Sequence, residues 1–486
     1  MTQARATHGR RLCGISVAAL TLVAAVPAWA QTAAAPMPQD PTDPSFWTGL
    51  FAPSRTNLLN DMFGLRTALG NDGISLGLQE TSEVLGNVTG GTRRTADYDG
   101  LTEISLGIDT QKAFGWDGGT FNVSALQIHG RDLSTDSLQT LQTASGIEAN
   151  RATRLWELWY QQAFLDGKID VKVGQQSIDQ EFLASQYSGL FINTMMGWPM
   201  LPSADLYAGG PAYPLSSPGV RLRAQPTGAI TLLAGVFDDN PPGGPFNSDS
   251  QVRGAEQSGA AFNLRTGALV IAEVQYAVNQ PSLGQMATAG QPSGLAGTYK
   301  LGAWYDSAQF PDQHLDSAGL SLADPAGSGI PLLHRGNYSV YGVVDQMVWQ
   351  PDPQGPQSLG VFVRAMGAPD DRNLINFSVN AGLSLKAPMP TRDNDTVGLG
   401  YGFAKVSSSA SALDKDAAVF SGQPMLVRSS ESFAELTYQY QIAPWWQAQP
   451  DIQYVFLPGG GIANPASPGQ RIGNELVLGL RTAITF

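Results

Sequence analysis

The chain ends on the stretch N-E-L-V-L-G-L-R-T-A-I-T-F, residues 474–486, in which two kinds of side chain alternate. One set of alternate positions holds Leu476, Leu478, Leu480, Thr482, Ile484 and Phe486, and the other holds Glu475, Val477, Gly479, Arg481, Ala483 and Thr485. Successive side chains of a β-strand point to opposite faces. The stretch therefore predicts a strand with one apolar and one mixed polar face, and this strand reaches the end of the chain.

The same alternation recurs along the sequence, in residues 169–174, 269–279, 361–366, 432–441 and 451–457. A soluble β-sandwich also alternates, but Lys and Glu should then crowd its solvent-facing positions. Here those positions hold a sparse mixture of Glu, Arg, Gln, Ser, Thr and Gly. Such a mixture is typical of the water-filled interior of a transmembrane barrel.

The composition favours the same fold. Charged residues make up only 14% of the chain, compared with about 25% in an average soluble domain. After residue 30 no apolar run approaches the ~20 residues of a membrane-spanning helix. Because the backbone of a spanning segment must be fully hydrogen-bonded, a closed barrel remains. We therefore predict an all-β fold, a transmembrane antiparallel β-barrel over residues 71–486.

The number of strands follows from the alternation. Seventeen candidate strands start near residues 74, 101, 119, 153, 167, 218, 229, 260, 269, 295, 337, 357, 373, 394, 431, 448 and 474. Single-chain bacterial barrels have an even number of strands, so we predict sixteen and expect one of these to be spurious. Asp166-Gly167 predicts a tight hairpin turn. Long Gly/Pro/Ser-rich stretches, expected as extracellular loops with some folded into the pore, cover residues 180–217, 238–259, 279–294 and 307–336.

The N-terminal region precedes the barrel. Residues 1–30 combine three arginines, an apolar run and a closing Ala-Trp-Ala, which predicts a secretory signal peptide and a mature chain that begins at Gln31. A membrane anchor is the alternative, although the apolar run is short for a spanning helix. Residues 31–54 are expected to form a flexible leader. Residues 55–70 are expected to form a short periplasmic helix, with Asn57 as its cap.

Charge and cysteine content exclude several classes of function. Cys13, the single cysteine, lies in the predicted signal peptide, so we expect no disulfide, thiolate metal site or cysteine nucleophile in the mature chain. Once the three arginines of residues 1–30 are removed, 25 Lys and Arg residues face 41 Asp and Glu residues, and the net charge is −16. This acidity argues against a nucleic acid as partner.

Catalytic motifs are weak in this sequence. G-I-S-L-G, residues 73–77, matches the nucleophile elbow of hydrolases, but it lies within an alternating strand instead of a strand–turn–helix corner. The carboxylate pairs at 238–239, 370–371 and 393–395 fall in connections, as solvated turn residues or as a loop calcium site. No Walker loop or dinucleotide fingerprint is present. We predict no catalytic residue, no resident metal and no cofactor.

Three stretches carry a family resemblance: L-L-N-D-M-F-G-L-R-T-A-L-G-N-D-G-I-S-L-G-L (58–78), L-W-E-L-W-Y-Q-Q-A-F-L-D-G-K-I-D-V-K-V-G-Q (155–175) and Y-P-L-S-S-P-G-V-R-L-R (213–223), the last followed by A-G-V-F-D-D-N-P (234–241). Their order and spacing resemble the OprB-type carbohydrate-selective porins, although Met62-Phe63 replaces the commoner Trp-Gly of that family. The matching positions of the first stretch are Asp61, Gly64, Arg66, Leu69, Gly73 and Ile74. The resemblance spans roughly residues 55–486 and implies a sixteen-stranded outer-membrane channel for passive sugar uptake.

A sugar pathway needs polar groups for the hydroxyls and aromatic faces for the pyranose ring. The alternation predicts that the following candidates face the pore: Glu157, Trp159, Lys172, Arg221, Arg223, Glu273, Arg364, Glu435 and Arg481, together with Glu475. Arg221 and Arg223 are the strongest candidates, because a guanidinium can bind vicinal hydroxyls in a bidentate way. The alternative is that most of the set are ordinary pore residues in a charge ladder with water.

We therefore predict a porin in the outer membrane of a Gram-negative bacterium, through which glucose-like monosaccharides diffuse passively into the periplasm. A general, weakly cation-preferring porin is the first alternative, because the chain is acidic. A hydrolase built on an outer-membrane barrel is the second. The expected partners are small neutral sugars, outer-membrane lipid and the barrel-assembly machinery, whose recognition signal resembles the terminal strand that ends on Phe486.

Overall fold

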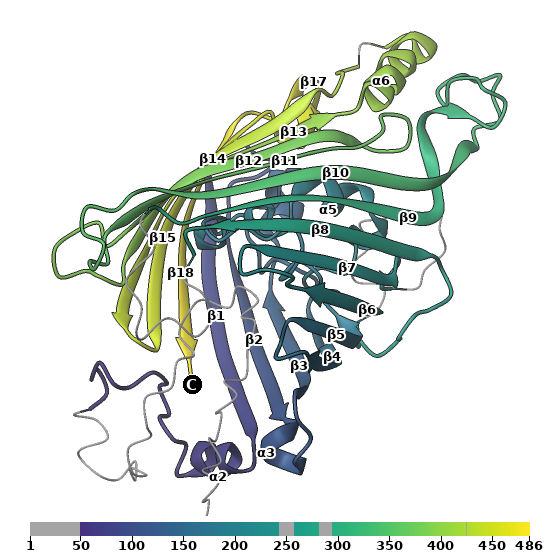
Figure 1. Ribbon diagram of the computed structural model, residues 1–486. Helices are drawn as coiled ribbons and strands as arrows, with labels where there is room; N and C mark the ends of the chain where they lie inside the picture. Colours follow the sequence, from purple (N-terminus) through teal and green to yellow (C-terminus); the bar gives the residue numbers. More distant parts are fainter. Residues whose placement is uncertain (1–48, 243–256, 281–293, 424) are drawn as a thin grey trace, which may run out of the picture.

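The computed structural model describes residues 49–242, 257–280, 294–423 and 425–486. Within these residues, sixteen strands form one closed antiparallel barrel, in which β18 completes the ring between β15 and β1 (Figure 1). This confirms the predicted fold class and number of strands. The predicted signal peptide and most of the predicted leader lie outside the described residues.

The sixteen strands follow the order of the chain. The first eight are β1 (Ile74–Thr89), β2 (Ala96–Asp109), β3 (Gly119–Gly130), β4 (Ala152–Phe164), β5 (Ile169–Gln176), β6 (Ser217–Ala224), β7 (Ile230–Asp238) and β8 (Ala268–Val278). The second eight are β9 (Gly297–Asp316), β10 (Pro331–Trp349), β11 (Ser358–Gly367), β12 (Ile375–Lys386), β13 (Thr396–Val406), β14 (Ser430–Ala443), β15 (Trp446–Phe456) and β18 (Glu475–Thr485).

The alternation of the sequence appears directly as two faces of the wall. In β18, Val477 is fully buried while its neighbour Leu478 is 45% exposed. In β8, Glu273 is 2% exposed and Val274 is 51% exposed. Exposed apolar side chains on the outer face and buried polar ones on the inner face are the arrangement of a barrel that meets lipid outside.

Two predictions about strands are wrong. The predicted strand near residue 260 is part of the connection between β7 and β8, and Phe262 there has a φ of 45°, which no strand residue adopts. The predicted loop over residues 307–336 is strand at both ends, because β9 extends to Asp316 and β10 begins at Pro331, and only residues 317–330 connect them.

The connections alternate between the two ends of the barrel. The turn end holds the C-terminus and the tight turn between β4 and β5, and the loop end holds the long connections 131–151, 177–216 and 407–429. Because strands run antiparallel, the connection from β8 to β9 lies at the turn end. Most of the predicted extracellular loop over residues 279–294 lies outside the described residues. Its described ends, Asn279, Gln280 and Gly294, adjoin the ends of β8 and β9 that lie with the short turns, so the prediction is wrong there.

The N-terminal segment lies at the turn end, below β1 in Figure 1. Its helix α2 (Leu65–Asn71) is shorter than the helix predicted for residues 55–70. The positive φ angles of Asn60, Met62 and Phe63 break the backbone into turns before α2, so Asn57 caps no helix. Gly64 stands at the start of α2, where a φ of 89° favours glycine.

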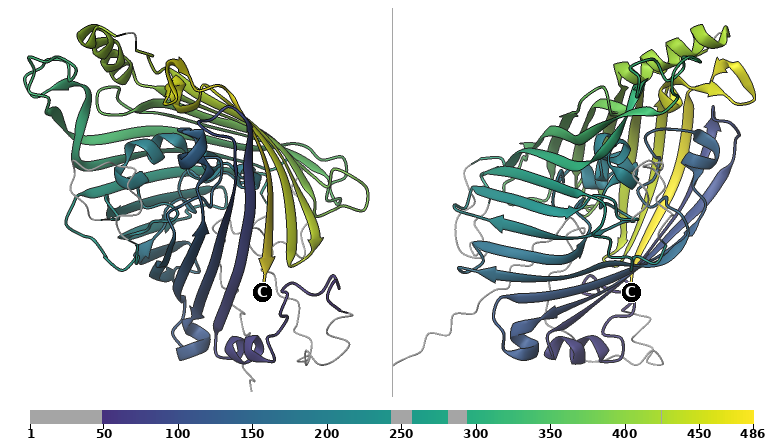
Figure 2. Two further views of the ribbon diagram at one scale, coloured as in Figure 1. Left: turned by 180° about the vertical axis from the view of Figure 1, so that it is seen from behind. Right: turned by 90° about the vertical axis from the view of Figure 1, so that its right-hand side faces the viewer.

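Residues 177–216, which we call the inner loop, pack inside the barrel (Figure 2). The inner loop contains η2 (Ser188–Leu190), α4 (Thr194–Gly197), α5 (Met200–Asp205) and η3 (Tyr207–Gly209). Its apolar side chains form two buried clusters with inward-facing wall residues, among them Phe237, Ile271, Trp304, Phe362 and Phe433. Part of the interior is therefore a packed core, whereas the sequence pattern predicted a sparse mixture of polar residues along the inner face of the wall.

The remaining elements lie at the two ends. α3 (Thr110–Phe114) joins β2 to β3 at the turn end, and η1 (Ser134–Leu138), α6 (Ser408–Ser421), α7 (Pro458–Gly461) and the pair β16 (Ala463–Asn464) and β17 (Ser467–Arg471) belong to loop-end connections. None of the helices in the described residues is long and apolar enough to cross a membrane.

Candidate functional site

The interior of the barrel is crossed by the inner loop, and wall side chains hold it in place. Arg364 of β11 is fully buried. Its guanidinium donates hydrogen bonds of 2.7–2.9 Å to four inner-loop carbonyl oxygens, those of Leu183, Met195, Met196 and Gly197. One side chain thus satisfies backbone acceptors from two separate parts of the inner loop and fixes their spacing.

Buried carboxylates of the wall bind the amide groups of the same loop. Glu435 of β14 accepts hydrogen bonds from the backbone N–H of Ile192 at 2.6 Å and of Asn193 at 3.3 Å. Glu273 of β8 accepts one from Leu183 N at 3.0 Å. These contacts restrain the inner loop from two parts of the wall, β14 and β8.

Asp345 of β10 is a third carboxylate of this kind. It accepts hydrogen bonds from the hydroxyl of Ser185 at 2.5 Å and from the backbone N–H of Gln186 at 3.1 Å. The ammonium group of Lys300 in β9 complements it by donating to the carbonyl oxygen of Ala184 at 2.7 Å. Donors and acceptors of the wall therefore match the acceptors and donors of one short turn in the inner loop.

An ion network on β5 and β6 fixes the start of the inner loop. Arg221 and Arg223 of β6 both pair with Asp170 of β5, which has no exposed surface. Arg221 Nε also lies 2.6 Å from Glu181 Oε2, and Lys172 pairs with the other oxygen of Glu181. Burial alone would raise the pKa of Glu181, but the charges of Lys172 and Arg221 outweigh it and hold this pKa below its usual value.

Trp159 stands beside this network on the inner face of β4. The ammonium nitrogen of Lys172 lies 4.6 Å from the centre of the Trp159 ring, a cation–π contact. Glu157, two residues away, accepts a hydrogen bond from Ser177 N at 3.0 Å. Trp159 itself is only half-buried, so an aromatic face and a cation border the interior here.

Residues 131–151 form a second segment that packs against the inner face of the wall. Gln453 of β15 donates to the carbonyl oxygen of Ala144 at 2.8 Å. Arg481 of β18 pairs with Glu83 of β1 at 2.8 Å, and Glu83 also accepts a hydrogen bond from the hydroxyl of Ser145. These bonds tie the segment to the place where the last strand meets the first.

The nine predicted site residues all project from the inner face of the wall, as the alternation predicts. Seven of them are buried beneath the inner loop or in ion pairs: Glu157, Lys172, Arg221, Arg223, Glu273, Arg364 and Glu435. Trp159 and Arg481 keep some exposed surface. Glu475 is buried as well. The structure therefore brings together the β4–β6 residues. Arg364, Glu273 and Glu435 lie on separate strands, where Arg364 and Glu273 both bind Leu183 of the inner loop and Glu435 binds Ile192 and Asn193.

Sequence reasoning missed the partners of these residues. Asp170 shares the inward parity of Lys172, and Asp345 shares that of Val343 and Met347, so the alternation could have identified both. Glu181 lies in the inner loop, where no periodicity applies. Only the fold shows that Glu181 reaches Lys172 and Arg221.

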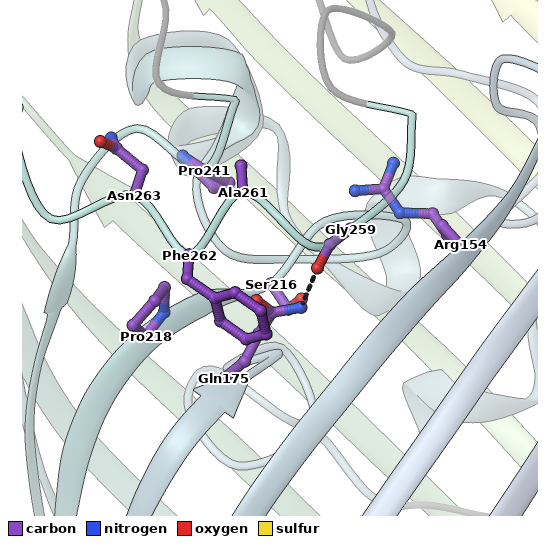
Figure 3. A pocket seen from close by; sticks show the side chains of 9 residues that line it. All are labelled: Arg154, Gln175, Ser216, Pro218, Pro241, Gly259, Ala261, Phe262 and Asn263. Carbon is purple, nitrogen blue, oxygen red and sulfur yellow. Dashed lines mark hydrogen bonds between the residues drawn. The ribbon is translucent and has the colours of Figure 1, made fainter.

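A small pocket lies where the connection between β7 and β8 meets the wall (Figure 3). It is lined by Arg154, Gln175, Ser216, Pro218, Pro241, Gly259, Ala261, Phe262 and Asn263. The amide of Gln175 donates to the carbonyl oxygen of Gly259 at 2.7 Å, the dashed line in Figure 3. Gln175 also donates to the carbonyl oxygen of Trp156 at 3.1 Å. The side chain of Gln175 therefore connects the β7–β8 connection to the wall.

The carboxylate pairs of the connections bind protein donors. Asp371 pairs with Arg372 at 2.8 Å, and this hydrogen bond and the arginine charge hold the pKa of Asp371 below its usual value. Asp395 pairs with Arg392 at 2.7 Å. In the part of the chain that the structure describes, no group of three or more His, Cys, Asp or Glu side chains is placed to hold a metal ion.

The sixteen-stranded barrel with its packed inner loop can now be compared with known proteins. A family model described as "Carbohydrate-selective porin, OprB family" matches residues 93–486. The chain belongs to this family. Membership confirms the resemblance noted in the sequence. The protein is therefore a carbohydrate-selective porin. Its barrel is of the type found in the Gram-negative outer membrane.

Two named relatives match the porin over most of its length. Porin B of Pseudomonas aeruginosa is 24% identical over 460 residues, which cover 90% of this chain and 92% of the relative. The putative porin QuiX of Acinetobacter baylyi is 23% identical over 440 residues, which cover 85% of this chain and 90% of the relative. The shared length extends beyond the region of the family model toward the N-terminus.

Solved structures support the fold of the porin. The high-pH structure of Pseudomonas putida OprB has a TM-score of 0.76 and 23% identity, and the match covers 89% of this chain and 98% of that chain. The low-pH structure of the same protein has a TM-score of 0.53 at 17% identity, with the same coverage of both chains. The arrangement of strands described above is thus shared with a solved barrel.

The family-like motifs of the porin have visible structural roles. Asp61 accepts hydrogen bonds from the N–H and the hydroxyl of Thr67, at 2.8 and 2.9 Å, and so fixes the first turn of α2. Gly174, within the Val-Gly-Gln of β5, has a φ of 134°, and a Cβ there would lie 2.2 Å from the carbonyl oxygen of Leu158. Only glycine fits so close to the neighbouring strand.

Proposed function

We propose that this porin passes small neutral sugars, of the size of glucose-like monosaccharides, into the periplasm by passive diffusion. The observation that carries the proposal is the inner loop, which Arg364, Glu273 and Glu435 fix across the barrel interior. A fixed segment inside a barrel narrows the path and presents groups at constant positions. Selection then depends on pore size and on local hydrogen bonds, which a neutral solute can use.

We propose that two of the nine site residues contact the sugar and that the other seven hold the inner loop or one another in place. Trp159 and Arg481, which keep exposed surface on the inner face, contact the passing sugar through an aromatic face and a guanidinium. The seven buried residues act on the sugar indirectly, because they hold the inner loop or hold one another. Arg221 and Arg223 belong to this group, since both are engaged with Asp170.

Planar-bilayer recording tests the proposal. Glucose added to one side of a bilayer that contains the pure porin should reduce the ion current in a concentration-dependent way, because a bound sugar obstructs the path. Liposome-swelling rates for sugars of graded size should fall steeply above the size of a monosaccharide. Current that high glucose leaves unchanged, together with rates that follow solute size alone, would favour a general porin.

The general porin remains the second candidate because of one observation. Carboxylates outnumber basic groups in the chain, which favours cations near the pore mouths. Reversal potentials in a salt gradient measure this preference directly. A cation preference without sugar block would identify the general porin, whereas sugar block identifies the selective one whatever its ion preference.

We propose further that the porin has no hydrolytic activity. Ser75, the centre of the elbow-like motif, lies within β1, and its hydroxyl donates to the carbonyl oxygen of Gly107 at 3.3 Å. No turn follows it until the end of a sixteen-residue strand, so it lacks the exposed corner that an elbow needs. Pure porin incubated with ester, lipid and oligosaccharide substrates should release no product, and any turnover abolished by Ser75→Ala would contradict this.

The proposal also covers how the porin is exported and assembled. Residues 1–30 direct the chain across the inner membrane and are removed before Gln31, and the strand that ends on Phe486 is read by the barrel-assembly machinery before the outer face meets lipid. Fractionation should place the porin in outer-membrane vesicles. N-terminal sequencing of that material should start at Gln31, and a start at Met1 would contradict the signal peptide.

A further inference from the structure

Three carboxylates are buried at the loop end of the barrel, where β7 leads into its connection to β8. Strand β7 ends on Asp238 and Asp239 follows it, the pair for which the sequence allows either solvated turn residues or a loop calcium site. Neither residue is solvated, because Asp238 is 4% exposed and Asp239 has no exposed surface. Asp306 of β9 is also fully buried. A buried carboxylate is costly unless a positive charge or several donors compensate it.

Asp238 is compensated by donors of the connection itself. Its Oδ1 accepts hydrogen bonds from the backbone N–H of Asn240 at 3.1 Å and from the amide of Asn263 at 2.9 Å. The hydroxyl of Thr266 donates to the same oxygen at 3.1 Å. Asp238 therefore needs no further partner, which sets it apart from the other two carboxylates.

Asp239 and Asp306 are each compensated on one oxygen only. The backbone N–H of Gly267 donates to Asp239 Oδ1 at 2.7 Å, and that of Ala308 donates to Asp306 Oδ1 at 2.9 Å. The Oδ2 atoms of both carboxylates are buried, and neither has a hydrogen-bond partner in the part of the chain that the structure describes. The backbone thus fixes two carboxylates in place and leaves one oxygen of each unsatisfied.

These two carboxylates lie next to each other. The side chains of Asp239 and Asp306 are within hydrogen-bond reach, and the charges that act most strongly on Asp306 are those of Asp239 and Asp238, both negative. Among the described residues, no lysine or arginine pairs with Asp239 or Asp306. Two carboxylates cannot both stay ionised at such a contact unless a cation lies between them, and without one they must share a proton.

Neutral oxygens surround the unsatisfied carboxylate oxygens. A Cβ at Gly267 would lie 2.6 Å from Asp239 Oδ2 and 3.2 Å from Ser307 Oγ, so both oxygens border a point that glycine leaves open. The phenol of Tyr207, in the inner loop, is close enough for both carboxylates to act on it electrostatically. Its hydroxyl donates to the carbonyl oxygen of Gln309, and its oxygen can still accept. A set made of carboxylate and neutral oxygens suits a hard cation.

We propose that Asp239 and Asp306 bind a calcium ion between them. The ion takes the two Oδ2 atoms as ligands and neutralises the repulsion between the carboxylates. The hydroxyl oxygens of Ser307 and Tyr207 are neutral candidates for further positions, since calcium accepts six to eight oxygens in irregular geometry, whereas magnesium requires an octahedron and keeps several waters. The site joins the end of β7 to β9 and, through Tyr207, to the inner loop.

Terbium luminescence tests the site. Terbium(III) binds where calcium binds and emits light when a nearby aromatic ring is excited, a role that Tyr207 fills here. The folded porin in detergent is stripped of bound cations with EDTA and then titrated with terbium chloride. The titration should saturate at one tightly bound terbium ion per chain. Excess calcium chloride should quench the emission, and the same concentration of magnesium chloride should not.

Two double variants show where the terbium binds. Asp239→Asn with Asp306→Asn removes both charged ligands at nearly constant size and should weaken terbium binding by about tenfold or more. Asp117→Asn with Asp166→Asn removes the same charge from exposed residues of the turn end and should bind terbium as the unmodified porin does. Heat-modifiable migration must show that each barrel is folded.

Urea unfolding of the stripped, unmodified porin is a second measurement that needs no variant. Calcium chloride should raise the urea concentration at the midpoint of unfolding, because a ligand that binds only the folded state stabilises it. An unchanged midpoint would mean that the two carboxylates share a proton instead, and the proposal would be overturned. Emission that magnesium quenches as well as calcium does, or a folded double asparagine variant that binds terbium normally, would also overturn it.

Discussion

The guanidinium of Arg66, ahead of the first strand, donates a hydrogen bond to the carbonyl oxygen of Phe486, the last residue of the chain. Arg66 also donates to the carbonyl oxygen of Leu76 at 2.6 Å, and Phe486 N donates to that of Leu78 at 2.9 Å. The backbone N–H of Leu58 reaches Thr485 at 2.7 Å. The two ends of the chain therefore close the ring together, at the turn end.

Deletion of Phe486 should reduce the yield of folded porin in vivo by at least tenfold, because it removes both the final pairing with β1 and the aromatic end of the last strand. Heat-modifiable migration on a gel measures the folded fraction. A normal yield of folded barrel from the truncated chain would show that Phe486 is dispensable for assembly.

Replacement of Arg66 by Ala should leave assembly intact but destabilise the closed barrel. The loss of a charged donor to two backbone carbonyls costs about 1.5–3 kcal/mol per hydrogen bond. Urea unfolding in detergent, followed by tryptophan fluorescence, measures the change. Arg94→Ala, at an exposed residue of the loop end, is the matched control and should unfold as the unmodified porin does.

Arg364→Ala should release the inner loop from the wall. Four buried carbonyl oxygens lose their donor, and each unsatisfied buried acceptor costs about 1–3 kcal/mol. We expect a larger and noisier single-channel conductance and a weaker block by glucose. Arg335→Ala removes an exposed charge at the loop end and should alter neither. A quiet channel of unchanged conductance would mean that Arg364 does not hold the loop.

Arg221 and Arg223 should contribute mainly to the stability of the barrel. Their replacement by Ala leaves the fully buried Asp170 without its partners, a change that typically costs about 3–5 kcal/mol. We expect lower stability in urea and a pore with greater cation preference in reversal-potential measurements. The double Lys variant keeps both charges and should restore most of the stability. Alanine variants of normal stability and ion preference would place the two arginines outside any network.

Trp159→Ala should weaken glucose block severalfold in bilayers, because an aromatic face contributes about 1 kcal/mol when it packs on a partner. Conductance in the absence of sugar should change little. Trp116→Ala, an exposed residue of the turn end, serves as the control. If both variants bind glucose as the unmodified porin does, the ring of Trp159 is not part of the pathway.

Helix α6 at the loop end should lose a docking contact in acid. His314 Nε2 lies 2.7 Å from Asp416, and this contact lowers the pKa of Asp416 from its usual value near 3.9. A carboxyl whose folded pKa is lowered stabilises the docked helix above the usual value, and this stabilisation is lost as the pH falls through the lower folded value. Docking through this contact should therefore hold near pH 5 and weaken below about 4.

A spin label at Val419→Cys, in the Cys13→Ser background, reports the mobility of α6. Its spectrum should sharpen as the pH falls from about 5 to below about 4. Asp416→Asn removes the titrating carboxyl group. In this variant the label on residue 419 should be equally mobile at about pH 5 and below about pH 4. A spectrum that does not change between about pH 5 and pH 3 would contradict this assignment to Asp416.

The sequence by itself determined the wall of this barrel. Alternation fixes which side chain of a strand faces which side, because the pleat allows only two directions. For that reason the inward positions of Lys172, Arg221, Arg364 and Glu435 could be predicted. Alternation alone gave seventeen strands, and the even number of strands in bacterial barrels reduced them to sixteen.

Only the tertiary structure decided what lies inside the wall. The inner loop has no period, and its contacts join residues more than a hundred positions apart, such as Arg364 with Leu183 or Glu435 with Ile192. Parity shows that a side chain points inward but cannot show whether water, a sugar or a folded loop meets it there. That choice depends on how residues 177–216 pack their apolar side chains against the wall, because burial of that surface determines which polar groups lose access to water.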